Sequence, residues 1–293
     1  ARRQRQMCIR DSQIPVQYAV IVDESHPFGL YSAMSFTAII LAAGKGTRMN
    51  SALPKPLHRV GGHAMLAWSM DAARLAGAER IVTVLALGSE DIQDWLDGAP
   101  FAIQEDQLGT GNAVASAREA VGNEDGVAIV MFADTPLVSA ASLKQLADGV
   151  KAGAGIVIAG FRPDDPSGYG RLVEDADGTI SRIVEDRECS PAERAIGLCN
   201  GGIMAVSRSL LFNWLDRVTN DNAKGEYYLT DIVAIAQADG AAIRHAVIDE
   251  TEVMGVNDRR DLAVAEAALQ ARLRKAAMEA GVTMIAPETV FLS

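Results

Sequence analysis

Residues 37–57 read TAIILAAGKGTRMNSALPKPL, and this stretch decides the fold class. The apolar run TAIILAA is typical of a buried β-strand, and glycines follow it that let the backbone approach a ligand closely. Three cations, Lys45, Arg48 and Lys55, lie just beyond the strand. Because open α/β sheets bind ligands at the carboxyl ends of their strands, and because backbone N–H groups in such turns favour anions, the stretch predicts a phosphate-binding loop.

The loop matches neither of the two common phosphate-binding motifs. A P-loop needs Ser or Thr directly after its lysine, but Gly46 follows Lys45. A dinucleotide-binding fingerprint needs a third glycine where this chain has Met49. The sequence therefore argues against a P-loop protein and against a nucleotide-binding dehydrogenase. The alternative to a phosphate site is a plain strand-to-helix turn with solvated cations.

Apolar runs and amphipathic stretches alternate from residue 34 onward. The β-rich runs lie at residues 37–43, 80–87, 101–104, 126–132, 155–161 and 241–248, and helical periods lie at 63–77, 89–98, 109–122, 139–153, 207–218, 226–240 and 258–280. This order predicts an α/β, Rossmann-like fold with a mixed, mostly parallel sheet flanked by helices. Residues 168–186 place the turn signal DADG between two short alternating runs, which predicts a β-hairpin beside the sheet.

Composition narrows the classes of partner. The 293 residues carry a formal net charge of −11, whereas a protein that follows a nucleic-acid backbone usually carries a basic stripe. The three cysteines, Cys8, Cys189 and Cys199, are widely spaced, which suits a reducing cytosol better than a disulfide framework. No apolar run approaches the ~18 residues of a membrane span. We therefore expect a cytoplasmic protein that binds a small anionic ligand, with no nucleic acid and no membrane as partner.

Nine short motifs then follow one another along the chain. They are LAAGKGTRM (41–49), LPKPL (53–57), QLGTGNA (107–113), DTPL (134–137), PSGYGR (166–171), IVED (183–186), CNGGI (199–203), EYYLTD (226–231) and GVND (255–258). Together they resemble the uridylyltransferase domain of the bacterial bifunctional N-acetylglucosamine-1-phosphate uridylyltransferase / glucosamine-1-phosphate acetyltransferase family. The resemblance implies a nucleotidyltransferase fold in which UTP and N-acetylglucosamine 1-phosphate give UDP-N-acetylglucosamine and pyrophosphate, for peptidoglycan and lipopolysaccharide precursors.

Two alternatives stay open beside this resemblance. One is a nucleotidyltransferase for another base or another sugar 1-phosphate. The other is a non-catalytic relative that keeps the fold and has a regulatory role. The presence of Arg48, Lys55, Asp134 and Asn257 argues against the second alternative.

The resemblance also implies which residues bind the nucleotide and which act on the phosphates. The nucleotide-binding positions are Leu41, Ala42, Ala43, Gly44, Lys55, Gln104, Gly109 and Thr110. The catalytic positions are Arg48, which would stabilise the departing pyrophosphate, Lys55, which would contact a phosphoryl oxygen in the transition state, and Asp134. Because the attacking sugar-phosphate oxygen is already an anion near neutral pH, this reaction needs alignment and charge stabilisation rather than a general base.

Mg²⁺ is the cofactor that the resemblance implies. Asp134 comes directly after an apolar run, so its carboxylate is expected at the carboxyl end of a strand, and Mg²⁺ prefers carboxylate and phosphate oxygens. Taken alone, such an Asp is more often a helix N-cap or a turn residue. The resemblance implies that Asp134 and Asn257 are the two metal ligands.

The sugar-binding positions implied by the resemblance are Phe132, Ala133, Gly170, Glu185, Asn200 and Asn257. Two positions depart from the pattern of the family. Ala133 stands where the family usually has Gly, and its methyl group is expected to crowd the ribose or phosphate slightly. Gly201 stands where the family more often has Thr or Ser, which puts one hydrogen bond to the sugar in question.

The expected domain division follows from the same comparison of motifs. Residues 1–33 show no sustained period and are interpreted as a non-native or disordered leader. Residues 34–260 are the nucleotidyltransferase domain, 261–280 a linker helix, and 281–293 the start of a left-handed β-helix. In the family, that β-helix carries the acetyltransferase and the contacts of a homotrimer.

Overall fold

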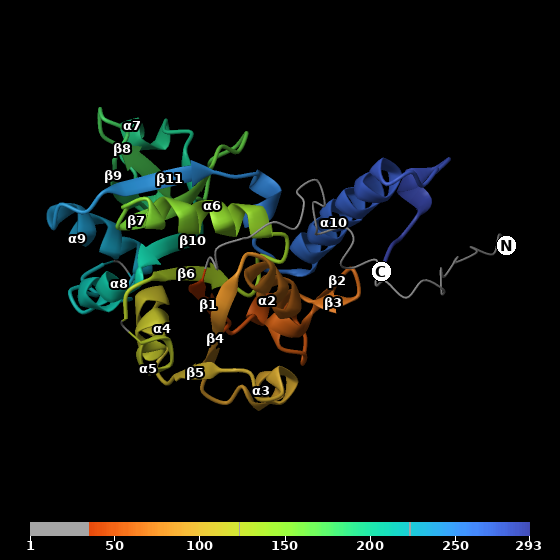
Figure 1. The fold of residues 1–293 in the computed structure, drawn as a ribbon, viewed down its shortest axis with the longest axis horizontal. Coiled ribbons are helices and arrows are strands. Elements are labelled where there is room, and N and C mark those ends of the chain that lie inside the picture. Colours follow the sequence, from red (N-terminus) through yellow and green to blue (C-terminus); the bar gives the residue numbers. More distant parts are fainter. Residues whose placement is uncertain (1–34, 123, 223) are drawn as a thin grey trace.

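The computed structural model describes residues 35–122, 124–222 and 224–293. The predicted leader at 1–33 therefore lies outside the described residues. Within them, one large sheet forms the centre of the molecule (Figure 1). The order of its main strands is β11 (Ile243–Val247), β7 (Ile156–Phe161), β10 (Cys199–Ser207), β6 (Val127–Phe132), β1 (Phe36–Leu41), β4 (Ala78–Ala86) and β5 (Phe101–Gln104).

The sheet confirms the predicted mixed, mostly parallel arrangement. Strand β1 pairs in parallel with both β4 and β6, and β4–β5 and β7–β11 are also parallel pairs. Strand β10 pairs antiparallel with β6 and with β7. The sequence analysis did not assign β10 as a strand, because Gly201 and Gly202 interrupt its apolar pattern where the pairing register shifts between Asn200 and Met204.

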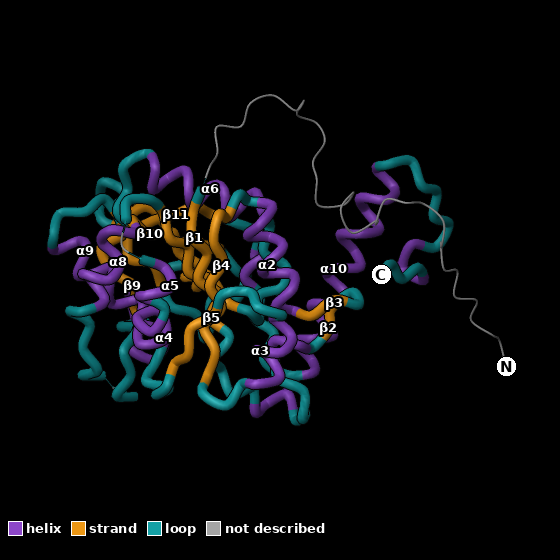
Figure 2. The backbone as a smooth tube through the Cα atoms, turned by 60° about the horizontal axis from the view of Figure 1, so that its bottom comes forward, coloured by secondary structure: helices purple, strands orange, loops and turns teal. Residues whose placement is uncertain are grey.

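Helices cover both faces of the sheet (Figure 2). One face packs against α2 (Met65–Leu75), α3 (Glu90–Leu96) and α6 (Ala140–Lys151), and the other against α4 (Thr110–Ser116), α5 (Arg118–Val121), α8 (Arg208–Leu215) and α9 (Ile232–Ala238). In β1, Ala38 and Ile40 face the first core while Ile39 and Leu41 face the second. This alternation is the period-two burial that a strand covered on both faces requires.

The predicted hairpin is present as β8 (Arg171–Glu174) and β9 (Ile180–Val184), which pair antiparallel. Arg171 of β8 also pairs with Cys199 of β10, so the hairpin continues the main sheet. A second small sheet joins β2 (Arg59–Val60) and β3 (His63–Ala64). This small sheet lies near the amino-terminal end of the long helix α10 (Arg259–Glu279), and the helix extends away from the central sheet (Figure 1).

Helix α10 is fastened to the rest of the molecule by a separate apolar cluster. Ala265, Leu269 and Leu273 of the helix pack against Val60, Met65, Leu137 and Val256. The segment after α10 turns back along the helix, where buried Gln270 donates to the carbonyl of Leu292 at 2.7 Å and accepts from its N–H at 2.8 Å. The predicted β-helix start at 281–293 stays a prediction. Among the described residues, no helix is long and apolar enough to cross a membrane.

Candidate active site

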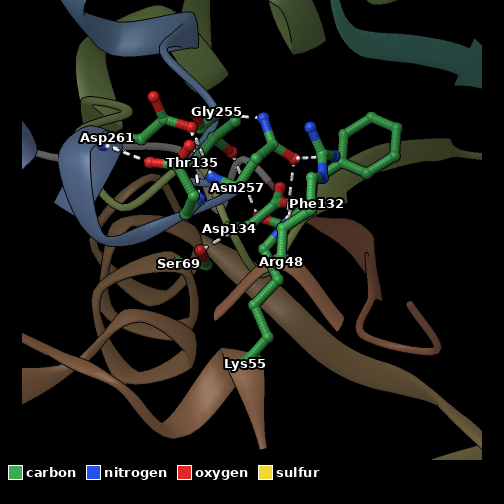
Figure 3. A network of polar contacts seen from close by, with 10 residues as sticks. Arg48, Lys55, Ser69, Phe132, Asp134, Thr135, Gly255, Asn257 and Asp261 are labelled. Atoms are coloured by element: carbon green, nitrogen blue, oxygen red, sulfur yellow. Dashed lines mark hydrogen bonds and ion pairs between the residues drawn. The ribbon is translucent and has the colours of Figure 1, made fainter. Parts of the chain in front are cut away.

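Four side chains from three distant segments meet at the carboxyl end of the parallel strands (Figure 3). Lys55 Nζ lies 2.5 Å from Asp134 Oδ2 and 3.2 Å from Asn257 Oδ1. Arg48 donates from Nη2 to the same Asn257 Oδ1 at 2.9 Å. The structure therefore brings together the residues that the sequence analysis named for the phosphates and the metal.

Local structure explains how each of the four reaches this point. Arg48 lies in the 3₁₀ turn η1 (Thr47–Met49), which begins after Gly46 in the left-handed region at φ 59°. A Cβ at Gly46 would lie 2.6 Å from Lys55 Cβ, so glycine is needed for the loop to pack against η2 (Lys55–Leu57). Asp134 follows β6, and its carbonyl accepts from Val256 N–H at 2.8 Å. That backbone bond brings the 254–257 segment, and with it Asn257, beside the end of β6.

The donor set fits a hard divalent cation. Asp134 Oδ2 and Asn257 Oδ1 already converge on one positive group, the ammonium of Lys55. Carboxylate and amide oxygens are ligands that Mg²⁺ accepts, and Mg²⁺ usually takes only one or two protein ligands with water and substrate phosphates completing its shell. Among the described residues, no group of three or more His, Cys, Asp or Glu side chains could hold a metal. Asp134 and Asn257 could hold such a cation as a pair, and their roles as metal ligands stay a prediction.

A cavity of about 700 Å³ lies at the phosphate-binding loop and shares Lys55 with this cluster, whereas Arg48, Asp134 and Asn257 do not line it. Segments that follow β1, β4 and β5 line it, so it lies outside the carboxyl ends of parallel strands, where open α/β sheets bind their ligands. Of the predicted nucleotide-binding residues, Ala42, Ala43, Gly44 and Lys55 line the cavity, and Leu41, Gln104, Gly109 and Thr110 do not. Gln107, which the sequence analysis did not select, lines the cavity and donates to the carbonyl of Ala43.

Comparison with known proteins decides the family. The model of the MobA-like NTP transferase domain matches residues 38–286. The chain belongs to the MobA-like NTP transferase family. This NTP transferase domain is 49% identical over 261 residues to the bifunctional protein GlmU of Maricaulis maris strain MCS10, covering 88% of this chain and 58% of that protein. It is 45% identical over 264 residues to the GlmU protein of Paramagnetospirillum magneticum strain AMB-1, covering 89% of this chain and 59% of that protein.

These matches confirm the resemblance that the nine motifs predicted. The chain spans somewhat less than two thirds of the length of the two GlmU relatives. The fold is also that of a solved structure described as UDP-glucose pyrophosphorylase complexed with UDP-glucose, with a TM-score of 0.67 over 82% of this chain and all of that one. Because the sequence identity there is 18%, this likeness bears on the fold alone.

Several predicted nucleotide-binding residues of this NTP transferase domain have roles within the fold itself. Gln104 is buried and donates to Gly109 O at 3.1 Å and to Asn112 Oδ1 at 2.7 Å, and its contact with a base stays a prediction. Gly109 has φ 110°, and a Cβ there would lie 2.6 Å from the carbonyl oxygen of Tyr227. Thr110 Oγ1 accepts from Leu229 N–H at 3.0 Å. These contacts fix the QLGTG segment against the EYYLTD segment.

Three of the six predicted sugar-binding residues, Gly170, Glu185 and Asn200, form a second group around the hairpin, whereas Phe132 ends β6, Ala133 is in the core and Asn257 lies in the Arg48 cluster. Asn200 N–H donates to Gly170 O at 2.8 Å, and Asn200 Oδ1 accepts from Gly202 N–H at 2.9 Å. Glu185 follows β9, and burial raises the pKa of its carboxyl group, with nearby Lys224 acting in the opposite direction. In the described part of the chain, no hydrogen bond or ion pair joins Gly170, Glu185 or Asn200 directly to the Arg48–Asn257 cluster. Their sugar-binding roles stay predictions.

Both departures from the family pattern have a structural account. Ala133 is 1% exposed, and its methyl group belongs to the apolar core on the α2 and α6 face of the sheet. The expected crowding of the ribose or phosphate by this methyl group is therefore not what the fold shows. At Gly201, a Cβ would lie 2.6 Å from Val253 Cγ1 and 2.9 Å from the carbonyl oxygen of Ala159. A Thr or Ser at this position would therefore require β10 or its neighbours to rearrange.

Sequence reasoning also missed Asp261, whose carboxylate accepts from the backbone N–H of Asn257 at 2.8 Å (Figure 3). A capping box places a hydrogen-bonding residue at the N-cap of a helix and an acidic or amide residue three positions later. In α10 these two residues are Asp258 and Asp261. That local signal could have placed a carboxylate beside the predicted metal ligand.

Proposed function

We propose that this chain transfers the uridylyl group of UTP to N-acetylglucosamine 1-phosphate and releases pyrophosphate, as a Mg²⁺-dependent cytoplasmic enzyme. The observation that carries the proposal is the convergence of Arg48, Lys55, Asp134 and Asn257 beside the cavity of the phosphate-binding loop. The identity of 45–49% to proteins named as bifunctional GlmU supports this choice of reaction.

The geometry supports an in-line displacement at the α-phosphorus of UTP. Backbone N–H groups of residues 43–46 would hold the nucleotide phosphates, because the glycines there allow close approach, while the N–H of Ala42 donates to the carbonyl of Val84 at 2.8 Å. The oxygen of the sugar phosphate forms the new bond to phosphorus as the bond to pyrophosphate breaks, and no proton has to be removed. Arg48 and Lys55 would align the two polyanions and stabilise the charge that builds on the leaving group.

Mg²⁺ held by Asp134 and Asn257 would neutralise negative charge on the phosphate oxygens. The protein contributes by holding the two ligand residues at a fixed separation and orientation. The bond from Val256 N–H to the carbonyl of Asp134 fixes their separation, and the side-chain amide of Asn257 is oriented by its contact at 3.4 Å with the carbonyl of Gly255.

Pyrophosphate release tests the proposal directly. The 293-residue chain is assayed with UTP, ATP, CTP, GTP and dTTP against N-acetylglucosamine 1-phosphate, glucosamine 1-phosphate and glucose 1-phosphate, with Mg²⁺ or with EDTA. We expect the highest kcat/KM for UTP with N-acetylglucosamine 1-phosphate and loss of turnover in EDTA. A higher kcat/KM for glucose 1-phosphate would instead indicate the alternative sugar, and no release with any pair would indicate the non-catalytic relative.

A further inference from the structure

The first turn of α10 makes an unusual contact with the proposed metal ligand. Asp258 is the N-cap of the helix, and Asp261 is its third residue, so the two form a reciprocal capping box. In such a box the third residue accepts from the N–H of the N-cap. Here Asp261 Oδ2 does so at 3.3 Å, but it also accepts at 2.8 Å from the N–H of Asn257, one residue further back. The shorter of the two bonds therefore goes to Asn257 and not to the helix cap.

The backbone that leads into Asn257 is held at two points by this arrangement. Val256 N–H donates to the carbonyl of Asp134, the other proposed ligand. The N–H of Asn257 itself donates to the carboxylate of Asp261. With the backbone fixed at two successive peptide units, Asn257 Oδ1 is presented to the same point as Asp134 Oδ2.

The position of Asp261 is itself fixed by the packing of α10. Val256 and Ala265 are fully buried in the cluster that joins the helix to the sheet domain. Arg259, in the same turn as Asp261, donates from Nε to the carbonyl of Met49 at 3.1 Å and lies 3.3 Å from His58 Nδ1. The first turn of α10 is therefore tied by Arg259 to the loop that carries Arg48.

We propose that Asp261 is a positioning residue for metal binding, which acts by holding the backbone of Asn257. The inference rests on the metal role of Asn257 in the proposed function, but it does not depend on which nucleotide or sugar reacts. Groups that hydrogen-bond to a ligating residue fix its orientation, and their loss typically costs about 10- to 100-fold in metal affinity or activity. A purely structural role would instead lower stability and leave affinity unchanged.

The experiment measures Mn²⁺ affinity of the full chain without substrates, by titration calorimetry or by electron paramagnetic resonance, together with the melting temperature. Asp261→Ala is expected to weaken Mn²⁺ binding by about tenfold or more. Asp261→Asn, which keeps an acceptor oxygen, is expected to restore part of that loss. Asp258→Ala is the control for the helix cap and should lower the melting temperature while changing affinity by less than about twofold. Lys275→Ala, whose side chain is 76% exposed further along α10, is the surface control and should change neither.

A second readout separates positioning from simple loss of fold. With UTP and N-acetylglucosamine 1-phosphate, raising the Mg²⁺ concentration should recover turnover in Asp261→Ala, because the defect lies in metal affinity. Mn²⁺ affinity of Asp261→Ala equal to that of Asp258→Ala would overturn the inference, and so would a wild-type chain that binds no Mn²⁺. If the wild-type chain binds Mn²⁺ but releases no pyrophosphate, and Asp261→Ala loses that binding, the inference holds and the proposed function does not.

Discussion

The ammonium nitrogen of Lys55 lies 2.5 Å from Asp134 Oδ2, with the Lys55 side chain only 11% exposed. The same nitrogen lies 3.2 Å from Asn257 Oδ1, so one lysine bridges both proposed metal ligands. A divalent cation bound between these two oxygens would take the space of the ammonium group. Lys55 is therefore expected to move toward the substrate phosphates when the metal binds, where its charge can act on the reaction.

This relationship predicts opposite effects of Lys55→Ala on metal binding and on turnover. Turnover should fall by about 10²–10³, the range typical of one preorganised electrostatic contact. Mn²⁺ affinity of the substrate-free chain should rise, because a competing positive charge is removed. Lys144→Ala, on the surface of α6 where Lys144 pairs with Asp148 at 2.8 Å, is the control and should change neither quantity. Unchanged or weaker Mn²⁺ binding in Lys55→Ala would contradict the competition.

Arg48→Ala is predicted to lower turnover with little change in stability. Arg48 is exposed, and its bond of 2.9 Å to Asn257 Oδ1 is a surface contact, so its loss should leave the melting temperature nearly unchanged. Pyrophosphate release should fall by about 10²–10³, because the leaving group loses a positive charge. Arg74→Ala removes a comparable surface arginine that pairs with Asp71 at 2.8 Å, and should keep full turnover. Turnover of Arg48→Ala close to that of Arg74→Ala would exclude the role proposed for Arg48.

Asp134→Asn tests the metal site without disturbing the backbone that holds it. The carbonyl of Asp134 accepts from Val256 N–H, and this bond survives the substitution. The amide has no negative charge for the metal, so turnover should fall and excess Mg²⁺ should restore it only in part. Pyrophosphate release is measured against Mg²⁺ concentration for both proteins. Equal Mg²⁺ dependence in the two would show that Asp134 is not a ligand.

Gly201→Ser is predicted to destabilise the fold. The added Cβ would lie 2.6 Å from Val253 Cγ1 and 2.9 Å from the carbonyl oxygen of Ala159, and overpacking of this kind costs about 1–3 kcal/mol. Urea unfolding measures the loss, and Val253→Ala in the same chain should recover only part of it because the backbone contact remains. Gly197→Ala, whose Cβ would meet only Arg162 Nη1 at 4.0 Å, is the control. Full stability of Gly201→Ser would show that β10 can shift at no cost.

The raised pKa of Glu185 predicts a pH dependence of sugar-phosphate binding. Burial is the main cause of the shift, and the charges of Glu188 and Asp186 add to it while Lys224 opposes it. Since the folded pKa lies above the ordinary value, the carboxylate becomes protonated at a higher pH than a free glutamate, and it then accepts poorly from a sugar hydroxyl. The KM for sugar phosphate should therefore rise as pH falls toward the acidic range.

The control for this profile is Glu185→Gln, which cannot titrate. The ratio of KM values for wild type and variant cancels the titration of the phosphate itself, so the remaining pH dependence belongs to position 185. The effect on stability has the opposite sign, because a raised carboxyl pKa makes folding less favourable as pH rises from the unfolded pKa to the folded one, whereas binding weakens as pH falls. A KM ratio that stays constant with pH would exclude a role for the Glu185 carboxylate in binding.

The sequence by itself determined the elements and the chemical character of the site. The runs at 37–43, 126–132 and 155–161 became β1, β6 and β7, because burial on both faces leaves a continuous apolar run that can be read locally. The motif order also supplied the identities of Arg48, Lys55, Asp134 and Asn257. The strand signals are local, since they depend on residues a few positions apart, whereas the order of the motifs runs from residue 41 to residue 258.

Only the tertiary structure decided how those residues meet and what holds them. Arg48 and Asn257 are 209 positions apart, and the hydrogen bond between them exists because the start of α10 packs against Val60, Met65 and Leu137, with Arg259 bonded to Met49 of the loop that carries Arg48. The antiparallel place of β10 and the inward direction of the Ala133 methyl group arise in the same way. Each depends on which distant segment packs against which, and periodicity in the sequence carries no record of that choice.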